Sequence, residues 1–172
     1  GTKMQSLQRR WLDLWDRFSA TRGSRLLFPL GIVLALYLFA AIVIGIYWSW
    51  APSQFDVRAT AAERAAAEQS EVVVGSHTTS TLISLVETLL DKPGGYISND
   101  RTPPGVWLDN ISNWEFGVLV QARDLSRAMR KTFSRSQSQS TEQPDLAAAE
   151  PRLHFDNNSW LLPSTESEYR DA

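Results

Sequence analysis

The 172 residues include no cysteine and 43% hydrophobic residues, and the formal net charge is −2. This composition excludes a disulfide-stabilised scaffold and is not that of a disordered chain. The charge is unevenly distributed: residues 1–25 carry six basic and two acidic side chains, a net charge of +4, whereas residues 51–172 carry 11 basic and 17 acidic ones, a net charge of −6. The acidic larger part argues against general binding to nucleic acid.

Residues 1–25 have the pattern of a basic amphipathic segment. Apolar side chains recur at helical spacing while the charged ones fall largely on the other side of the helical wheel. The apolar positions are Leu7, Trp11, Leu14, Trp15 and Phe18. Such a segment is expected to lie in the headgroup layer of a membrane, here on its cytoplasmic side.

Residues 26–50 contain no charged side chain and 14 Leu, Ile, Val or Phe residues. A helix of this length measures about 38 Å and exceeds a hydrocarbon core of about 30 Å, so the stretch predicts a transmembrane helix. A cleaved signal peptide is the alternative. Tyr47, Trp48 and Trp50 stand where a signal peptidase requires small residues, and they suit a membrane interface. An uncleaved anchor is therefore predicted.

The arginines that flank this span predict its direction. Five lie within about 20 residues on the N-terminal side and two, Arg58 and Arg64, on the other, so the positive-inside rule places the N-terminus in the cytoplasm.

Small residues also form a stripe along the span, where another helix would pack closely. They are Gly31, Ala35, Ala41 and Gly45. Composition alone is the alternative explanation, because small residues are common in spans.

The part after the span reads as mainly α-helical. The alanine-rich residues 57–74 predict a helix within a stalk, 51–75, that ends at Gly75. A second helix follows the Ser/Thr run 76–81 and stops at Pro93-Gly94-Gly95, before a loop over 96–105. Its apolar face comprises Leu82, Ile83, Val86, Leu89 and Leu90.

A third helix is predicted from about Ser112 to Phe133, with Asp109 or Asn113 as its cap. It is amphipathic. Its apolar stripe is Trp114, Val118, Ala122, Leu125, Met129 and Phe133, and its basic group is Arg123, Arg127, Arg130 and Lys131. The basic group either complements the helix dipole or forms a docking face for an anionic partner.

The rest of the chain is predicted to contain a polar linker over 134–143, a helical turn at 145–150 and another helix that starts near 163–168. These segments complete a predicted domain over 76–172 with long loops.

Few residues of the sequence suggest a catalytic, metal-binding or ligand-binding site. The two histidines, His77 and His154, are far apart and no cysteine accompanies them, so no metal or cofactor is expected, and the pattern favours a non-enzymatic role. One cluster mixes aromatic, amide and carboxylate side chains as sugar-binding sites do. It comprises Trp107, Asp109, Asn110, Asn113, Trp114 and Glu115. A helix cap with two core tryptophans explains the same residues.

Four strings carry a resemblance to a known family. They are 93–100 (PGGYISND), 104–117 (PGVWLDNISNWEFG), 134–140 (SRSQSQS) and 155–160 (FDNNSW). The chain resembles domain-of-unknown-function family 2333, which comprises uncharacterised proteobacterial membrane proteins. The resemblance implies a Gram-negative inner membrane with the domain in the periplasm, and a further helical region after Ala172. It supplies no catalytic residues. The residues before Met4 are expected to be a remnant or a trimmed start.

The sequence thus predicts a single-pass inner-membrane protein with a periplasmic helical domain for interaction or scaffolding. An envelope glycan-binding or glycan-cleaving protein and an accessory subunit of a larger membrane complex are the alternatives. The expected partners are the lipid bilayer and a membrane or periplasmic protein, or a second copy through the transmembrane helix, and no nucleic acid.

Overall fold

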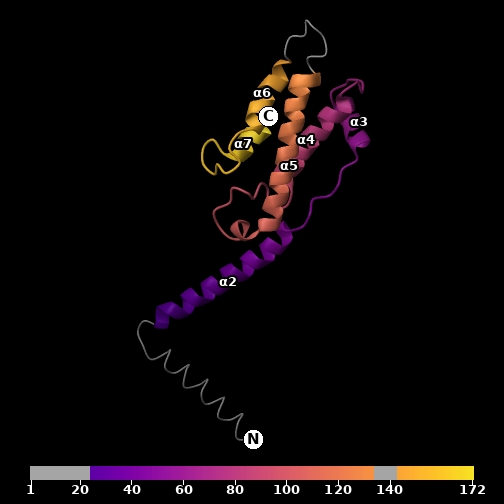
Figure 1. The fold of residues 1–172 in the computed structure, drawn as a ribbon. Helices are drawn as coiled ribbons and strands as arrows, with labels where there is room; N and C mark the ends of the chain where they lie inside the picture. Colours follow the sequence, from indigo (N-terminus) through magenta and orange to yellow (C-terminus); the bar gives the residue numbers. More distant parts are fainter. Residues whose placement is uncertain (1–23, 134–142) are drawn as a thin grey trace. The chain divides into compact units, whose positions relative to one another are not determined.

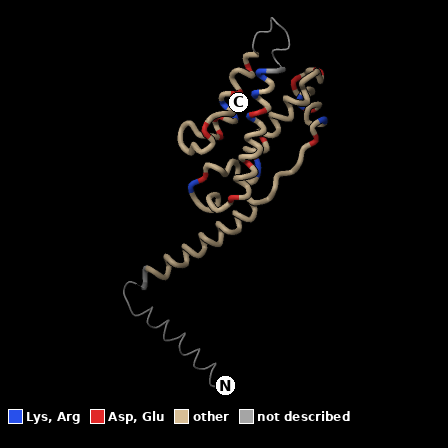
Figure 2. Tube along the Cα trace, viewed as in Figure 1, with Lys and Arg blue, Asp and Glu red and all other residues tan. Residues whose placement is uncertain are grey.

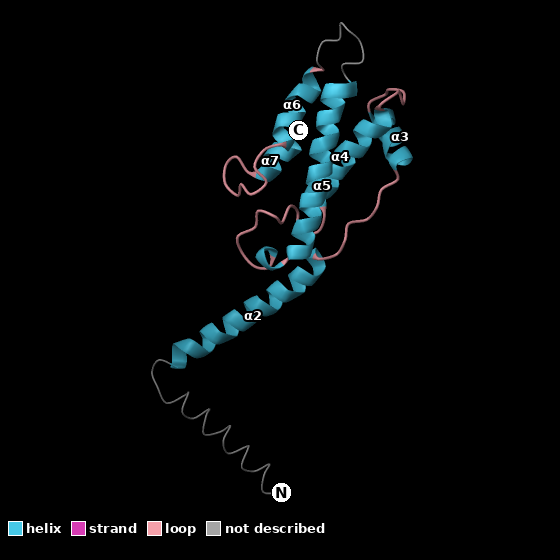
Figure 3. Ribbon diagram, in the orientation of Figure 1, coloured by secondary structure: helices cyan, strands magenta, loops and turns pink. Residues whose placement is uncertain are grey.

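The computed structural model describes residues 24–133 and 143–172. In these residues it has six α-helices, a 3-10 turn (η1) and a π-helical turn (η2), and no strand (Figure 3). The predicted mainly α fold is confirmed. The chain divides into two compact units, residues 1–43 and 44–172. The predicted amphipathic segment lies almost entirely outside the described residues.

Helix α2, Ser24–Trp48, is the apolar helix (Figure 1). Its stretch Leu27–Trp48 has 22 residues, nearly all of them exposed, so it is long and apolar enough to cross a membrane. It ends two residues before the predicted boundary, because Ser49 caps it: the backbone N–H and the hydroxyl of Ser49 both donate to the carbonyl of Gly45, at 3.0 and 2.7 Å. Figure 2 shows no charged residue along this stretch.

Helix α3, Val57–Ala67, starts at an N-cap formed by Asp56, whose carboxylate accepts hydrogen bonds from two backbone N–H groups at 2.8 Å. The helix is shorter than the predicted stretch 57–74, because Gln69 adopts a positive φ of 53° that reverses the chain. It packs against α4 with Ala61 and Ala65 buried. The helical part of the predicted stalk therefore belongs to the same packed unit as α4.

Helix α4, Ser76–Asp91, begins after Gly75, whose φ is +99°, so the Ser/Thr run 76–81 lies within the helix and does not precede it as predicted. The helix ends before Pro93, as predicted. Its apolar face packs against α5, Asp109–Ala128. The main core cluster consists of Leu89, Leu90, Tyr96, Leu119 and Tyr169. A second cluster, Leu82, Ala122 and Met129, extends it along the same two helices. Of the predicted apolar face of α4, Leu82, Leu89 and Leu90 are buried and Val86 is half-buried, whereas Ile83 is 40% exposed.

Helix α5 differs from its prediction in two ways. It begins at Asp109, with Leu108 at the N-cap, and no side chain caps it, so the predicted cap by Asp109 or Asn113 is wrong. It continues through η2, Met129–Phe133. Its buried residues are Ile111, Glu115, Leu119, Ala122 and Ser126. The buried face is therefore rotated around the helix axis from the predicted apolar stripe, and it includes the carboxylate of Glu115. Trp114 and Val118 lie at the edge of this face and are half-buried.

Two short helices complete the second unit. Helix α6, Pro144–Leu153, packs against α5, and α7, Thr165–Arg170, packs against both α4 and α6 (Figure 1). The Ser164 hydroxyl caps α7, near where the sequence predicted a helix start. Tyr169 is 1% exposed, and its ring meets Tyr96 edge to face with centroids 5.8 Å apart. The C-terminal segment is therefore part of the core.

Candidate functional site

A buried ion pair joins the turn after α4 to the first half of α5. The Lys92 ammonium contacts the Glu115 carboxylate and donates to the carbonyl of Gly95, and both charged side chains are 0% exposed. Moving two charges out of water costs several kcal/mol per ion unless hydrogen bonds replace the lost hydration. The surroundings of Glu115 supply those bonds.

Three further donors surround the Glu115 carboxylate. It accepts from the backbone N–H groups of Ile97 and Ser98 at 2.9 and 2.8 Å, and from the Ser98 hydroxyl at 2.5 Å. Glu115 thus fixes the turn over residues 92–98 against α5. Sequence reasoning assigned neither Lys92 nor Ser98 a role, since a lysine before Pro-Gly-Gly has the pattern of a solvated turn.

The next two residues continue this polar network toward the C-terminal segment. The Asn99 amide, 1% exposed, donates to the carbonyl of Ser159 at 2.9 Å and to the Glu166 carboxylate at 3.1 Å. Burial, with the nearby charges of Glu166 and Glu115, raises the pKa of Asp100. These contacts tie the loop after α4 to the loop before α7, so the network is structural.

The predicted glycan-binding residues do not share a cleft. Trp107 is exposed in η1, Gly105–Trp107, and Asp109 and Asn113 are exposed on the first turns of α5. Trp114 is half-buried against the main core cluster, and Glu115 is fully buried. Asp109 and Glu115 therefore cannot act as a pair of carboxylates across an open site, as glycoside hydrolysis requires.

The predicted basic face is largely occupied by the chain itself. The Arg123 guanidinium donates to the carbonyls of Leu153 and Phe155, at 2.6 and 2.7 Å, and to the Tyr169 hydroxyl at 3.0 Å. Charged donors to carbonyls form strong hydrogen bonds, so Arg123 holds the end of α6 and the start of α7 against α5. It is a positioning residue of the fold.

Arg127 and Arg130 both pair with the carboxylate of Glu150 on α6. The hydrogen bond from Arg130, followed by that from Arg127, lowers the pKa of Glu150. Arg127 also contacts the ring of His154 at 2.7 Å. Of the four predicted basic residues, Lys131 alone is exposed with no partner among the described residues 24–133 and 143–172. Hydrogen bonds and ion pairs within the chain thus engage all three arginines, although Glu150 supplies one carboxylate for two of them and the partners of Arg123 are neutral.

The small-residue stripe on α2 is divided. Gly31 and Ala35 are exposed, and a Cβ added at Gly31 would meet nothing within 4 Å. Ala41 and Gly45 are buried. A Cβ at Gly45 would lie 3.3 Å from Pro104, within the second unit. Gly31 and Ala35 are thus exposed like the residues around them on α2, whereas Gly45 accommodates a loop of its own chain.

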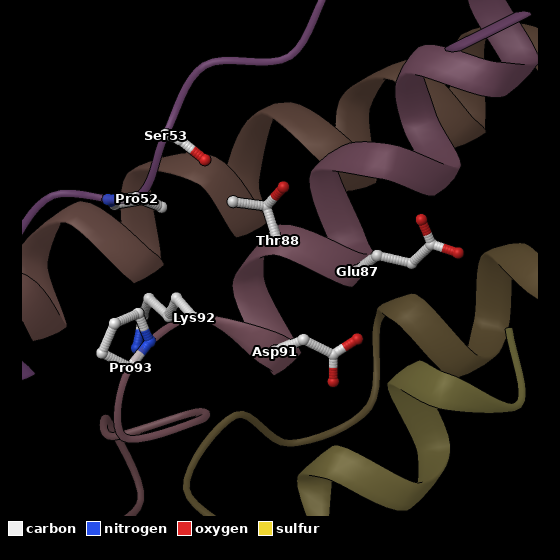
Figure 4. A pocket seen from close by; sticks show the side chains of 7 residues that line it. All are labelled: Pro52, Ser53, Glu87, Thr88, Asp91, Lys92 and Pro93. Atoms are coloured by element: carbon white, nitrogen blue, oxygen red, sulfur yellow. The ribbon is translucent and has the colours of Figure 1, made fainter.

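A shallow pocket of about 370 Å³ lies beside the C-terminal half of α4 (Figure 4). It is lined by Pro52, Ser53, Glu87, Thr88, Asp91, Lys92 and Pro93. Glu87 pairs with Arg64 and Asp91 pairs with Arg170, at 2.7 Å in the second case. The two carboxylates are already neutralised by arginines of this chain, and none of the predicted glycan residues lines the pocket.

Exposed apolar side chains gather in the loop before α7. Trp160, Leu161 and Leu162 are 57, 72 and 98% exposed. Single exposed apolar residues are ordinary on a protein surface, but three in a row present a continuous patch that water solvates poorly. We call this segment the apolar loop 160–162.

The fold and these sites define a class: a helical domain that follows an apolar helix long enough to cross a membrane. The sequence model of a family described as uncharacterised proteins conserved in bacteria, domain-of-unknown-function family 2333, matches residues 11–172. The chain belongs to this family, as the sequence motifs predicted. No curated protein and no solved structure matches the chain significantly.

Proposed function

We propose that this protein is a single-pass bacterial inner-membrane protein whose helical domain lies in the periplasm and binds a protein partner as a scaffold. The observation that carries the proposal is the stretch Leu27–Trp48 of α2, which exposes nearly all of its apolar side chains. Leaving each Leu, Ile, Val or Phe in water costs about 1.5–3 kcal/mol relative to burial. A hydrocarbon core removes this cost along the whole helix.

The charge distribution supports the direction. Before the span, residues 1–25 carry a net charge of +4, and the domain that follows is net acidic. Arginines near a span are retained in the cytoplasm. The N-terminus is therefore cytoplasmic and the domain periplasmic.

The surface of the domain supports a binding role. The apolar loop 160–162 lies outside the core clusters and stays exposed. Exposed apolar patches commonly mark sites of protein interaction. In the span, Gly31 and Ala35 offer a face on which another helix can pack.

A pair of reporter fusions after Ala172 tests the topology. We expect a reporter that folds only in the periplasm to be active and one that folds only in the cytoplasm to be inactive, because the arginine bias fixes the orientation. Neutralising Arg17, Arg22 and Arg25 together should produce a mixture of both orientations. Activity of the cytoplasmic reporter in the unaltered protein would refute the proposed topology.

Crosslinking from the apolar loop tests the binding role. The chain has no cysteine, so Leu162→Cys gives one reactive thiol at a position that is 98% exposed. A reagent that carries one maleimide and one photoactivated diazirine, applied to cells and illuminated, should join Leu162→Cys to one defined protein, identified by mass spectrometry. Val73→Cys, 64% exposed, is the matched control and should give no such product. Equal products from both positions would mean random collision, and no product from Leu162→Cys would contradict the binding role of this loop.

A further inference from the structure

The last turn of α2 belongs to the second unit, which begins at Ile44. Two loops of this unit close against it. A Cβ added at Gly45 would lie 3.3 Å from Pro104 and 3.8 Å from Leu108, and a Cβ added at Gly94 would lie 2.7 Å from the ring of Trp48. Both glycines therefore permit a close approach between backbone and loop. The turn that contains Pro104 is thereby fixed next to the end of the apolar helix.

This contact lies at the level of the last helical turn. Gly45 precedes Trp48 by three residues, which is about 4.5 Å along a helix axis. Tyr47 and Trp50 are 53 and 64% exposed, and their rings meet edge to face with centroids 5.9 Å apart. Exposed aromatic residues at the end of an apolar span mark the interface between hydrocarbon and water.

Residues 102–108 form a short turn with an apolar tip, which we call the apolar turn 102–108. It contains no Lys, Arg, Asp or Glu. Backbone hydrogen bonds from Val106 to Thr102 at 3.3 Å and from Trp107 to Pro104 at 3.0 Å hold its shape. The tip residues Val106 and Trp107 are nonetheless 56 and 51% exposed.

A packed neighbour explains why the tip cannot fold inward. Gly105 lies directly against Asp100: a Cβ at Gly105 would be 2.0 Å from a carboxylate oxygen of Asp100 and 2.6 Å from its Cβ. The backbone of the turn is therefore pressed against the domain, and the side chains on either side of Gly105 face outward or toward α2. An apolar tip held open in this way requires an apolar surrounding to lower its free energy.

We propose that the apolar turn 102–108 is a second membrane contact, whose Val106 and Trp107 enter the lipid interface beside the end of α2. The inference rests on the proposed function, since it needs α2 to span the bilayer. The occupant is lipid because the turn is continuous, through Pro104 and Leu108, with the helix that the bilayer surrounds. Tryptophan suits this position, since its ring is apolar and its N–H remains hydrogen-bonded to headgroups or water.

The two charged residues that flank the turn fit the same placement. Arg101 and Asp109 are both exposed, and neither lies within the uncharged stretch. A guanidinium at the rim of an apolar insertion can pair with lipid phosphate. The surface next to α2 is therefore apolar at its tip and polar at its margin.

Depth-dependent quenching of the full chain in lipid vesicles tests the contact. Val106→Cys, in a chain that has no other cysteine, is labelled with a fluorophore. An interfacial contact lies about 5–10 Å into the headgroup and acyl boundary, so a nitroxide near the top of the acyl chain should reduce the emission at least about twofold. Trp107→Cys provides an independent probe of the same tip.

Two control positions distinguish a failure of the proposed tip contact from a failure of the membrane anchor. Ile42→Cys, 56% exposed on α2, should be quenched by a nitroxide deep in the acyl chain. Val73→Cys precedes α4, whose 16 residues measure about 24 Å, and it should keep its emission. Quenching at Ile42 without quenching at Val106 and Trp107 would overturn the contact and leave the membrane anchor intact. No quenching at Ile42 would overturn the anchor itself, and equal quenching at Val73 and Val106 would show that the tip has no specific role.

Discussion

Glu115→Ala is expected to lower the free energy of unfolding by about 3–5 kcal/mol, the cost of removing one partner from a buried ion pair. The substitution leaves the Lys92 ammonium buried without its carboxylate. It also removes the acceptor of the Ile97 and Ser98 backbone N–H groups, which no water can reach without opening the domain. The loss should therefore far exceed that of an ordinary surface substitution.

Thermal unfolding of the full chain in detergent, followed by circular dichroism, measures this effect. Glu63→Ala is the matched control, since Glu63 is an exposed glutamate on α3. The double variant Lys92→Met/Glu115→Leu should recover part of the stability, because it removes both charges together. If Glu115→Ala unfolds at the temperature of the Glu63→Ala protein, the buried pair does not support the fold.

Arg123→Ala is expected to destabilise the C-terminal segment by an amount close to that of Glu115→Ala. Hydrogen bonds to a charged group contribute about 1.5–3 kcal/mol each, and Arg123 makes three to the segment that includes Leu153, Phe155 and Tyr169. Such contributions do not simply add, so a total of roughly 3–5 kcal/mol is expected. The Leu153 carbonyl and the buried Tyr169 hydroxyl would lose the Arg123 donor, and the Phe155 carbonyl would be left with the Tyr169 hydroxyl, which donates to it at 3.2 Å.

Amide hydrogen exchange measured by mass spectrometry locates this loss. Residues 151–172 should exchange much faster in the Arg123→Ala protein, while α3 and the start of α4 keep their protection. Lys131→Ala is the control on the same side of the chain, because Lys131 is exposed. Equal exchange in the two variants would show that Arg123 does not hold the segment in place.

Helices α2 and α4 were predictable because each depends on a local pattern. A long uncharged run specifies α2 whatever surrounds it, and the spacing of Leu82, Leu89 and Leu90, with Pro93 as a stop, specifies α4 and its buried face. The position of α5 was also predictable, but its rotation was not. A periodicity argument treats Glu115 as a surface residue, whereas the structure buries it beside Lys92.

The contacts that the charged residues make could not be predicted from local sequence patterns. Lys92 and Glu115 are 23 positions apart, and Arg123 reaches Tyr169 across 46 positions. Nothing in the spacing of either pair indicates contact, because the path of the chain between the two members decides which surfaces meet. The separation within the predicted glycan cluster could not be predicted for the same reason: Asp109 and Glu115 are close in the chain but differ completely in exposure.

The late position of Tyr169 in the chain has a consequence for biosynthesis. Its ring closes the core over Leu89 and Tyr96, and the Tyr96 hydroxyl donates to the carbonyl of Asn157 at 3.2 Å. A ribosome completes α4 about 80 residues before it adds Tyr169, so α5 can cover α4 early while the part of the core over Leu89 and Tyr96 stays open until Tyr169 is made. A nascent chain that stalls in this interval is an aggregation-prone species and a target for chaperones or proteases until α7 is added.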